Sequence, residues 1–173
     1  MKKLFLIRHC ETNQFEENTE DHKKKLNDNG LEDANILNQW FDKNKFDINT
    51  IYASSATRTA ETAKLIFNKH INKIKTQDSL YLCSKTEVLS LLQSLDKKVM
   101  DVALVGHEPS TSESLKYLIG NFRPDLEKIV GLPYPAGGIA IIYFNIKEWT
   151  ELDESTGILD AFITPSYLKS NER

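Results

Sequence analysis

The chain has 173 residues, of which 40% are hydrophobic and 27% charged, a composition typical of a globular protein with one full core. Its formal net charge of −3 gives no electrostatic reason to expect nucleic acid or an anionic membrane as a partner. No apolar segment is long enough to span a bilayer, and the apolar run after Lys3 is too short for a signal-peptide core. We therefore expect one cytoplasmic domain over residues 1–173, in which Cys10 and Cys83 are free thiols.

The N-terminal part of the chain begins with a short apolar run. Residues 3–7 predict a buried strand, because the run is short and bounded by charged side chains. Polar residues 11–29 predict a loop over the edge of a sheet. Asn29 is expected to cap the amphipathic helix that follows, with Glu32 at its third position.

A second strand and two further helices are predicted in the middle of the chain. Residues 51–53 form a short apolar run, and Ser54 or Ser55 is expected to cap the helix after it. Residues 74–82 are expected to be extended or irregular. Residues 84–87 read Ser-Lys-Thr-Glu, a capping box that predicts the start of the next helix.

The C-terminal part continues the alternation of strands and helices. Residues 101–105 and 139–144 predict buried strands. Residues 110–113 form a second capping box, whose helix is expected to stop at Gly120. Residues 158–168 are expected to add a hairpin or an edge strand. Strands that alternate with amphipathic helices are typical of an α/β layer fold.

An arginine or a histidine stands close behind three of these apolar runs. The first run ends in Arg8-His9, the second leads into a turn with Arg58, and the third ends in a Gly-His-Glu-Pro turn with His107. If the three strands are parallel, these side chains meet outside the carboxyl ends of the strands, where open α/β sheets bind ligands. The sequence therefore predicts a pocket rich in hydrogen-bond donors.

This set of side chains suits a phosphoryl group. Arginine presents a fixed fork of N–H donors that matches phosphate oxygens, and the start of the helix with Arg58 adds backbone N–H groups. A neutral imidazole can attack phosphorus and become a covalent phosphohistidine. A second, protonated imidazole would stabilise the charge of the transition state. We expect neither a metal nor another cofactor, because the arginines supply the positive charge.

The three motifs resemble those of the histidine phosphatase (phosphoglycerate-mutase-like) superfamily. They occur in the same order and read Leu6-Ile7-Arg8-His9, Ser54-Ser55-x-x-Arg58-Thr59-x-x-Thr62 and Val105-Gly106-His107-Glu108-Pro109. The chain length, residues 21–30 and the Gly-His-Glu-Pro turn resemble the small bacterial, SixA-like branch of phosphohistidine phosphatases. The similarity runs from residue 3 to about residue 165, which makes residues 1–173 one histidine phosphatase domain.

The resemblance implies both a fold and roles for the site residues. The fold is a three-layer α/β/α sandwich with a mostly parallel, mixed sheet of about six strands. His9 would be the nucleophile that becomes phosphorylated, and Arg8, Arg58 and His107 would bind the phosphoryl group around it. In the SixA-like branch an arginine at the position of Lys24 reaches the phosphate, so we expect Lys24 to bind the phosphate more weakly.

A second departure from the family pattern is Cys10, which stands where the family usually has glycine. Its thiolate could be stabilised by Arg8, which would make the site sensitive to oxidation. The alternative, which we favour, is an inert small side chain. For His22 and His70 we favour solvated surface positions, since both lie in polar stretches.

The proton donor is the least defined part of the site. Glu87 lies in the region where mutase-like members carry a glutamate, but the capping box already explains it. Glu108 follows His107, where the phytase-like branch carries an acidic donor, and it could instead be a helix-start residue. A phosphohistidine substrate depends less on a donor, because its imidazole leaves easily once it is protonated.

We expect a metal-independent phosphatase that works through a phosphohistidine on His9 and acts on protein phosphohistidine. A phosphatase for a small phosphate ester is the alternative within the same chemistry, and a mutase fits less well. From another class, a phosphate-binding or phosphohistidine-binding module without turnover would explain the Cys10 and Lys24 departures. A metal-dependent hydrolase that uses His9 and His107 is disfavoured, because the adjacent arginines would repel a cation.

Overall fold

All strands of the computed structural model, which describes residues 1–13, 19–130 and 132–171, belong to one mixed sheet. In these residues the sheet has seven strands, in the order β3-β2-β4-β1-β6-β7-β5. The strands are β1 (Lys2–Arg8), β2 (Thr50–Ser54), β3 (Ile74–Gln77), β4 (Asp101–Gly106), β5 (Ile119–Phe122), β6 (Ile139–Phe144) and β7 (Gly157–Ile163). The helices are α1 (Asp28–Asn44), α2 (Thr57–Ile66), α3 (Lys85–Gln93), α4 (Ser110–Leu118), α5 (Glu127–Val130) and α6 (Pro165–Asn171).

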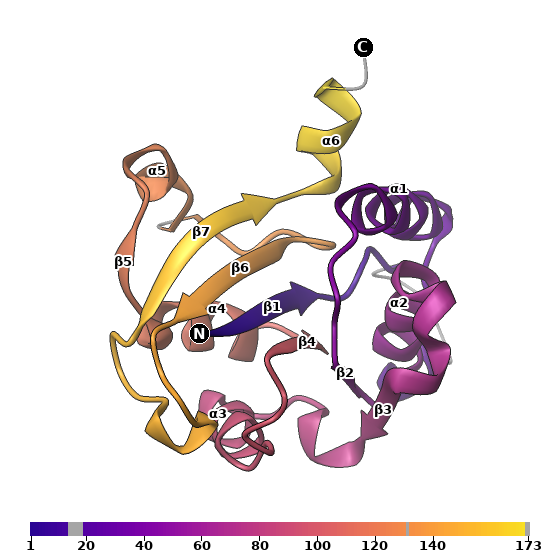
Figure 1. Ribbon diagram of the computed structural model, residues 1–173. Helices are drawn as coiled ribbons and strands as arrows, with labels where there is room; N and C mark the ends of the chain where they lie inside the picture. The colour runs from indigo at the N-terminus through magenta and orange to yellow at the C-terminus, as the bar shows by residue number, and fades with distance from the viewer. Residues whose placement is uncertain (14–18, 131, 172–173) are drawn as a thin grey trace.

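The half of the sheet that matters for the site is parallel. Strand β1 pairs in parallel with β4, and β4 and β3 pair in parallel with β2. The register places Arg8 opposite Gly106 and Ala53 opposite Val105, so β1, β2 and β4 end level with one another. Beyond β1 the sheet turns antiparallel at β6 and β7 (Figure 1). The carboxyl ends of three strands therefore share one edge.

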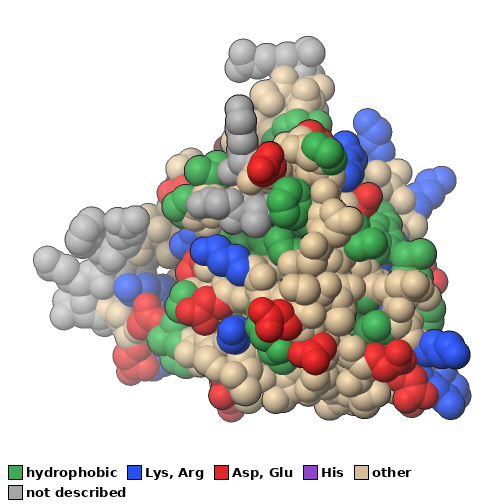
Figure 2. Space-filling model, turned by 90° about the vertical axis from the view of Figure 1, so that its left-hand side faces the viewer, with side chains coloured by type: hydrophobic (Ala, Val, Ile, Leu, Met, Phe, Trp, Pro, Cys, Tyr) green, Lys and Arg blue, Asp and Glu red, His purple; other side chains and the backbone are tan. Residues whose placement is uncertain are grey.

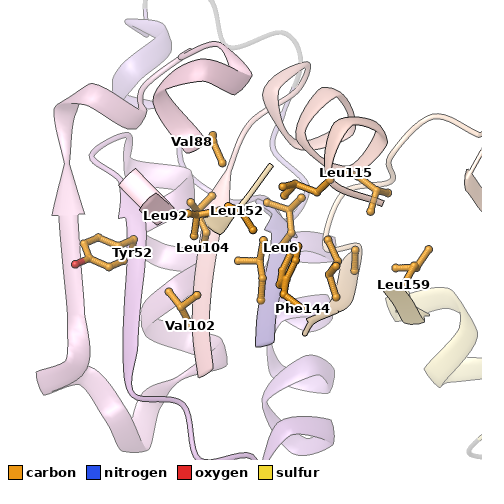
Figure 3. Packing of buried hydrophobic residues seen from close by; sticks show 14 of the residues in the cluster. Leu6, Tyr52, Val88, Leu92, Val102, Leu104, Leu115, Phe144, Leu152 and Leu159 are labelled. Carbon is orange, nitrogen blue, oxygen red and sulfur yellow. The ribbon is translucent and has the colours of Figure 1, made fainter. Parts of the chain in front are cut away.

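Helices cover both faces of the sheet, and the alternation of β1 shows how the core is divided. Leu4 and Leu6 point into a cluster with residues of α3 and α4, part of which Figure 3 shows from close by. Phe5 and Ile7 point to the other face, into a cluster with residues of α1 and α2. These four side chains are all fully buried. The three-layer α/β/α fold that the sequence analysis implied is confirmed.

The structure corrects the number of strands from about six to seven and revises the end of the chain. Residues 74–77, expected to be extended or irregular, form the edge strand β3. The helix expected to stop at Gly120 already ends at Leu118, and Gly120 lies within β5. Residues 158–163 do form a strand, but residues 165–171 form α6, which packs against α1.

Three of the expected helix caps are wrong. At α4, Pro109 and not Ser110 occupies the cap position, and the Ser110 hydroxyl donates to the carbonyl oxygen of His107 at 2.8 Å. Asn27, not Asn29, caps α1, and its side-chain oxygen accepts a hydrogen bond from the Gly30 N–H at 2.8 Å. Ala56 occupies the cap position of α2, because the hydroxyls of Ser54 and Ser55 contact histidines instead. The capping box of residues 84–87 is confirmed at the start of α3.

The face of the molecule in Figure 2 gives little sign of a strongly acidic or strongly basic partner. In Figure 2, acidic, basic and hydrophobic side chains are interspersed over the face shown. Among the helices of the described residues, none combines the length and the apolarity that crossing a membrane requires. Part of the loop expected over residues 11–29, namely 14–18, lies outside the described residues.

Candidate active site

His9 lies just beyond β1, and two hydrogen bonds fix its backbone and its ring. The backbone N–H of His9 donates to the carbonyl oxygen of Gly106 at 3.0 Å, which ties it to the end of β4. Its ring Nδ1 lies 2.6 Å from the carbonyl oxygen of Cys10. A carbonyl can only accept, so Nδ1 carries the proton and Nε2 keeps its lone pair. Burial, with Arg58 and Arg8 as further causes, lowers the pKa of His9 to about 4. The imidazole is therefore neutral at neutral pH and can act as a nucleophile.

His107 lies just beyond β4 and faces His9, with ring centroids 5.4 Å apart. Its Nε2 lies 2.8 Å from Oγ of Ser54, at the end of β2. Of the two groups in contact with the Ser54 oxygen, the Ala56 N–H can only donate, so Nε2 of His107 is the one that can accept the hydroxyl proton. Nε2 is then an acceptor, and the proton of the neutral ring sits on Nδ1.

Burial, followed by the charge of Arg58, lowers the pKa of His107 to about 3. The sequence analysis expected a protonated second imidazole, whereas the ring is neutral in this structure. A neutral Nδ1–H can still donate to an oxyanion, and a bound dianion would raise the pKa of the ring. His107 is therefore neutral where a charged ring was expected, but it can still donate a hydrogen bond.

Two buried nitrogen atoms at this edge have no hydrogen-bond partner among the described residues: Nε of Arg8 and Nδ1 of His107. The other end of the Arg8 side chain donates from Nη1 to the carbonyl oxygen of Tyr134 at 2.6 Å. A buried donor without a partner costs free energy, and an anion between the two side chains would satisfy both. This pair is the clearest structural sign of an anion site.

Arg58 joins the site from the first turn of α2 and is almost completely buried. Its guanidinium donates to Asp21 twice, to the backbone oxygen at 2.6 Å and to Oδ2 at 3.0 Å. The hydroxyl of Tyr81 donates to the same Oδ2 at 2.7 Å. These donors, Tyr81 first, lower the pKa of Asp21 to about 2. Asp21 therefore stays ionised and holds both Arg58 and Tyr81 in place.

Lys24 lies beside this pair. Its ammonium is 3.5 Å from Oδ1 of Asp21, and about a quarter of its side chain is exposed. Because Arg58 contacts the other oxygen of the same carboxylate, Lys24 lies next to Arg58. Whether Lys24 binds a phosphate stays a prediction.

His22 is not the solvated residue that the sequence analysis favoured. It is half-buried, and its Nε2 lies 2.9 Å from Oγ of Ser55. Its ring packs edge-on against Tyr81 with centroids 4.8 Å apart, and Tyr81 in turn packs against His107 at 5.7 Å. A third imidazole therefore belongs to the same cluster.

The structure shows the burial of Cys10 and the hydrogen bonds of Glu87 and Glu108. Cys10 is fully buried, and burial raises the pKa of its thiol to about 12, which favours the inert interpretation. Glu108 accepts a hydrogen bond from the N–H of Ser112 at 3.2 Å, in the first turn of α4. Glu87 accepts from the N–H of Ser84 at 2.8 Å, as the capping box requires.

Comparison with known proteins agrees with the sequence motifs. The family model of the histidine phosphatase superfamily (branch 1) matches residues 4–81, which contain Arg8, His9 and Arg58. Over these residues, somewhat less than half of its length, the chain is similar to the histidine phosphatase superfamily. The motif with His107 lies beyond the matched residues, and the structure brings it to the same edge as the other two. Among curated relatives, an uncharacterized protein from Mycobacterium leprae is 25% identical over 153 residues, 87% of this chain and 92% of the relative.

Solved structures share the fold over nearly the whole chain. A SixA-type protein from Agrobacterium tumefaciens has a TM-score of 0.78 at 23% identity, with 95% of this chain and 99% of that chain covered. The protein histidine phosphatase SixA complexed with tungstate has a TM-score of 0.75 at 18% identity, covering 96% and 99%. Phosphoserine phosphatase from Entamoeba histolytica has a TM-score of 0.64 at 18% identity, covering 97% and 100%. These likenesses establish a common histidine phosphatase fold.

Sequence analysis missed several residues that complete the cluster. Asp21 matched the family pattern, but nothing in the sequence linked it to Arg58. Tyr81 lies in a segment without periodicity, and Tyr134 lies in an aromatic loop. The buried hydroxyl of Tyr134 donates to the carbonyl oxygen of Leu6 and accepts the N–H of Ala140, so it anchors that loop against β1. None of these contacts is local in sequence.

Proposed function

We propose that this protein is a metal-independent phosphatase that uses His9 as its nucleophile. The observation that carries the proposal is a pair of buried donors near the neutral His9, Arg8 Nε and His107 Nδ1, which have no partner in the described part of the chain. A phosphoryl group between them would accept hydrogen bonds from both, and Arg58 would add a third donor. Each of these roles for Arg8, His9, Arg58 and His107 is part of the proposal.

The proposed reaction has two steps. In the first, Nε2 of His9 attacks phosphorus, the bond from phosphorus to the leaving group breaks, and its electron pair goes to the leaving atom. In the second, water attacks the phosphohistidine, the P–N bond breaks, and the electron pair returns to His9. The hydrogen bond from Nδ1 to the Cys10 carbonyl keeps the ring proton on Nδ1, so Nε2 has a lone pair with which to attack in the first step.

For the substrate we propose phosphohistidine on a protein. The SixA fold supports this choice, since 96% of the chain superimposes on a protein histidine phosphatase with a TM-score of 0.75. A small phosphate ester is the alternative, and the same fold in phosphoserine phosphatase from Entamoeba histolytica speaks for it. Turnover on the two kinds of substrate distinguishes them.

Metal independence is proposed from the charges at the site. The guanidinium groups of Arg8 and Arg58 both act on His9, where they lower its pKa. Two fixed positive charges that act on His9 would repel a cation and supply the charge that a metal would otherwise give a phosphoryl group. Turnover that is unchanged by a chelator is the expected result.

The deciding experiment compares wild type with His9→Ala on a histidine-phosphorylated protein and on an aryl phosphate, both with chelator present. Wild type is expected to release phosphate and to form an acid-labile phosphoenzyme, and His9→Ala is expected to do neither while it keeps its fold. Turnover of the aryl phosphate alone would favour the small-ester alternative. Phosphate binding without turnover of either substrate would leave a non-catalytic binding module and reject the enzyme.

A further inference from the structure

Arg8 is held by one short segment of the chain, residues 134–138, which leads into β6. The backbone N–H of Arg8 donates to the carbonyl oxygen of Gly138 at 3.1 Å, and its carbonyl oxygen accepts the N–H of Gly137 at 3.2 Å. Its guanidinium donates from Nη1 to the carbonyl oxygen of Tyr134 at 2.6 Å. The same segment therefore fixes both the backbone and the side chain of a proposed phosphate ligand.

Gly137 gives this segment the shape that brings it against Arg8. Its φ of +69° lies in the left-handed region, which a residue with a side chain rarely adopts. Its N–H bonds to two carbonyl oxygens, that of Arg8 at 3.2 Å and that of His9 at 3.1 Å. A Cβ at this position would lie 2.9 Å from the ring of Pro165, so a larger residue would push the segment away. The segment thus also holds the backbone of the proposed nucleophile.

The side chain of Tyr134 ties the segment to the sheet. Its hydroxyl donates to the carbonyl oxygen of Leu6 at 2.5 Å and accepts the N–H of Ala140 at 2.9 Å. Leu6 in β1 and Ala140 in β6 lie opposite each other in the register, so one hydroxyl bonds to both strands. Burial raises the pKa of this hydroxyl, so it stays protonated and remains a donor. The anchor lies two residues before Arg8 in the same strand.

The contact with the Tyr134 carbonyl constrains which part of the Arg8 side chain is left for a ligand. A guanidinium is planar, and its N–H groups point in fixed directions. While Nη1 bonds to the carbonyl, Nε is buried and has no partner among the described residues. Rotation of the group away from Tyr134 would redirect the Nε–H as well. The direction of this N–H therefore depends on where the segment places the carbonyl.

We propose that Tyr134 is a positioning residue for Arg8. Its hydroxyl holds residues 134–138 against β1 and β6, its carbonyl holds Nη1 of Arg8, and the Nε–H is thereby directed at the phosphoryl group. The proposal rests on the proposed function, since it takes Arg8 as a phosphate ligand. Tyr134 acts through Arg8 and needs no contact with the substrate.

Tyr134→Phe tests this role, because it removes the hydroxyl and keeps the ring, which packs on Phe162 with centroids 4.9 Å apart. We expect kcat/KM for an aryl phosphate to fall and the dissociation constant of inorganic phosphate to rise, each by about tenfold, because a loosened donor loses its alignment. Calorimetry measures the dissociation constant on folded protein, at a temperature well below the Tm. Wild-type values for both quantities would overturn the proposal.

A double-mutant cycle with Arg8→Lys separates positioning from a general loss of structure. Lysine keeps the positive charge but lacks the fork that the Tyr134 carbonyl holds. In the Arg8→Lys background we expect Tyr134→Phe to change the phosphate dissociation constant by less than about twofold, because the group that it positions is gone. Effects of the two substitutions that simply multiply would show that Tyr134 does not act through Arg8, and the proposal would be rejected.

Trp149→Phe is the matched control for stability. The indole N–H of Trp149 donates to the carbonyl oxygen of Val99 at 2.8 Å, and its ring is fully buried, so this variant also loses one side-chain hydrogen bond. Val99 precedes β4 and His107 follows it, so this contact lies at the opposite edge of the sheet from the site. We expect the Tm to fall in both variants and phosphate affinity to fall only in Tyr134→Phe. A comparable loss of affinity in Trp149→Phe would contradict positioning by Tyr134.

Measuring both binding and turnover separates failure of this inference from failure of the proposed function. If wild type hydrolyses a substrate and Tyr134→Phe matches it in rate and affinity, the proposed function stands and the role of Tyr134 is rejected. If wild type binds phosphate without turnover, the proposed function fails, and the role of Tyr134 is upheld by weaker phosphate binding in Tyr134→Phe or rejected by equal binding. If wild type neither binds phosphate nor turns over, both proposals are rejected.

Discussion

Oγ of Ser54 lies 2.8 Å from Nε2 of His107, and this contact decides which nitrogen of that imidazole carries the proton. The serine comes from the end of β2 and the histidine from the end of β4, two strands that pair in parallel. The Ala56 N–H can only donate to the Ser54 oxygen, so the hydroxyl proton is left to bond to Nε2 of His107. Ser54, which was expected from the sequence to cap a helix, thus orients His107, a side chain that we propose binds the phosphate.

Removing the Ser54 hydroxyl should therefore weaken the site without removing a charge. We expect Ser54→Ala to lower kcat/KM by about tenfold to a hundredfold, because losing one hydrogen bond to a buried group costs roughly 1–3 kcal/mol. Nitrogen-15 NMR of the His107 ring should show a mixture of tautomers in place of one. Ser114→Ala is the matched control, since the buried Ser114 hydroxyl has no partner in the described part of the chain. A rate equal in the two variants would contradict the role of Ser54.

Lys24 should affect binding more than chemistry. We expect Lys24→Ala to raise KM and the inhibition constant for inorganic phosphate by roughly threefold to tenfold, with kcat little changed, because a partly exposed charge contributes modestly. Steady-state kinetics with phosphate as inhibitor measure both values. Lys25→Ala is the control, as Lys25 is exposed one residue further along. Equal effects in both variants would mean that Lys24 attracts the anion only by its charge and does not bind the phosphate directly.

The buried histidines should make stability depend on pH. Burial lowers the pKa of His9 to about 4 and that of His107 to about 3, whereas both titrate near 6.5 in the unfolded chain. Below pH 6.5 the unfolded chain binds more protons, so the free energy of unfolding falls as the pH drops towards 4, by up to about 1.4 kcal/mol per pH unit for each histidine.

Melting curves from pH 8 to pH 4 check this dependence. The Tm of wild type should fall more steeply than that of the His9→Gln variant, because one of the two titrating groups is removed. Inorganic phosphate should flatten the wild-type curve, since a bound dianion favours the protonated rings. Parallel curves for wild type and His9→Gln would show that His9 titrates normally in the folded protein.

The cap of α1 gives a test of the corrected helix start. Asn27 accepts the Gly30 N–H and donates to the side chain of Glu11, so we expect Asn27→Ala to lower the free energy of unfolding by about 1 kcal/mol. Asn29→Ala changes the neighbouring exposed asparagine and should have little effect. Denaturant titration compares the two, and a larger loss in Asn29→Ala would restore the cap position expected from the sequence.

Cys10 should be chemically inert in the folded protein. Because burial raises the pKa of its thiol to about 12, we expect iodoacetamide to modify the half-buried Cys83 first and Cys10 only after unfolding. Mass spectrometry of partially alkylated protein measures the order. Cys10→Ala should keep its activity, and inactivation by peroxide that is reversed by thiol and absent from Cys10→Ala would support the oxidation-sensitive alternative instead.

The sequence by itself determined the strands and the residues at their ends. Residues 3–7, 51–53, 101–105 and 139–144 were identifiable as strands because each is a dense apolar run between polar segments. Arg8, His9 and His107 follow such runs directly, and parallel pairing is enough to bring them to one edge. A short edge strand such as Ile74–Gln77 lacks this signal, because its side chains are largely exposed and need not be apolar.

Only the tertiary structure decided which polar side chains complete the site. Ser54 contacts a histidine 53 positions away, Arg58 contacts Asp21 across 37 positions, and Tyr81 reaches the same carboxylate across 60. A serine before a helix is a cap by local rules, and a histidine in a polar loop such as His22 is solvated by the same rules. Local pattern carries no information on distant partners, because hydrogen bonds between polar groups depend on where the fold brings two chain segments together. The register of the sheet determines which chain segments lie side by side, and therefore which of these residues can bond to one another.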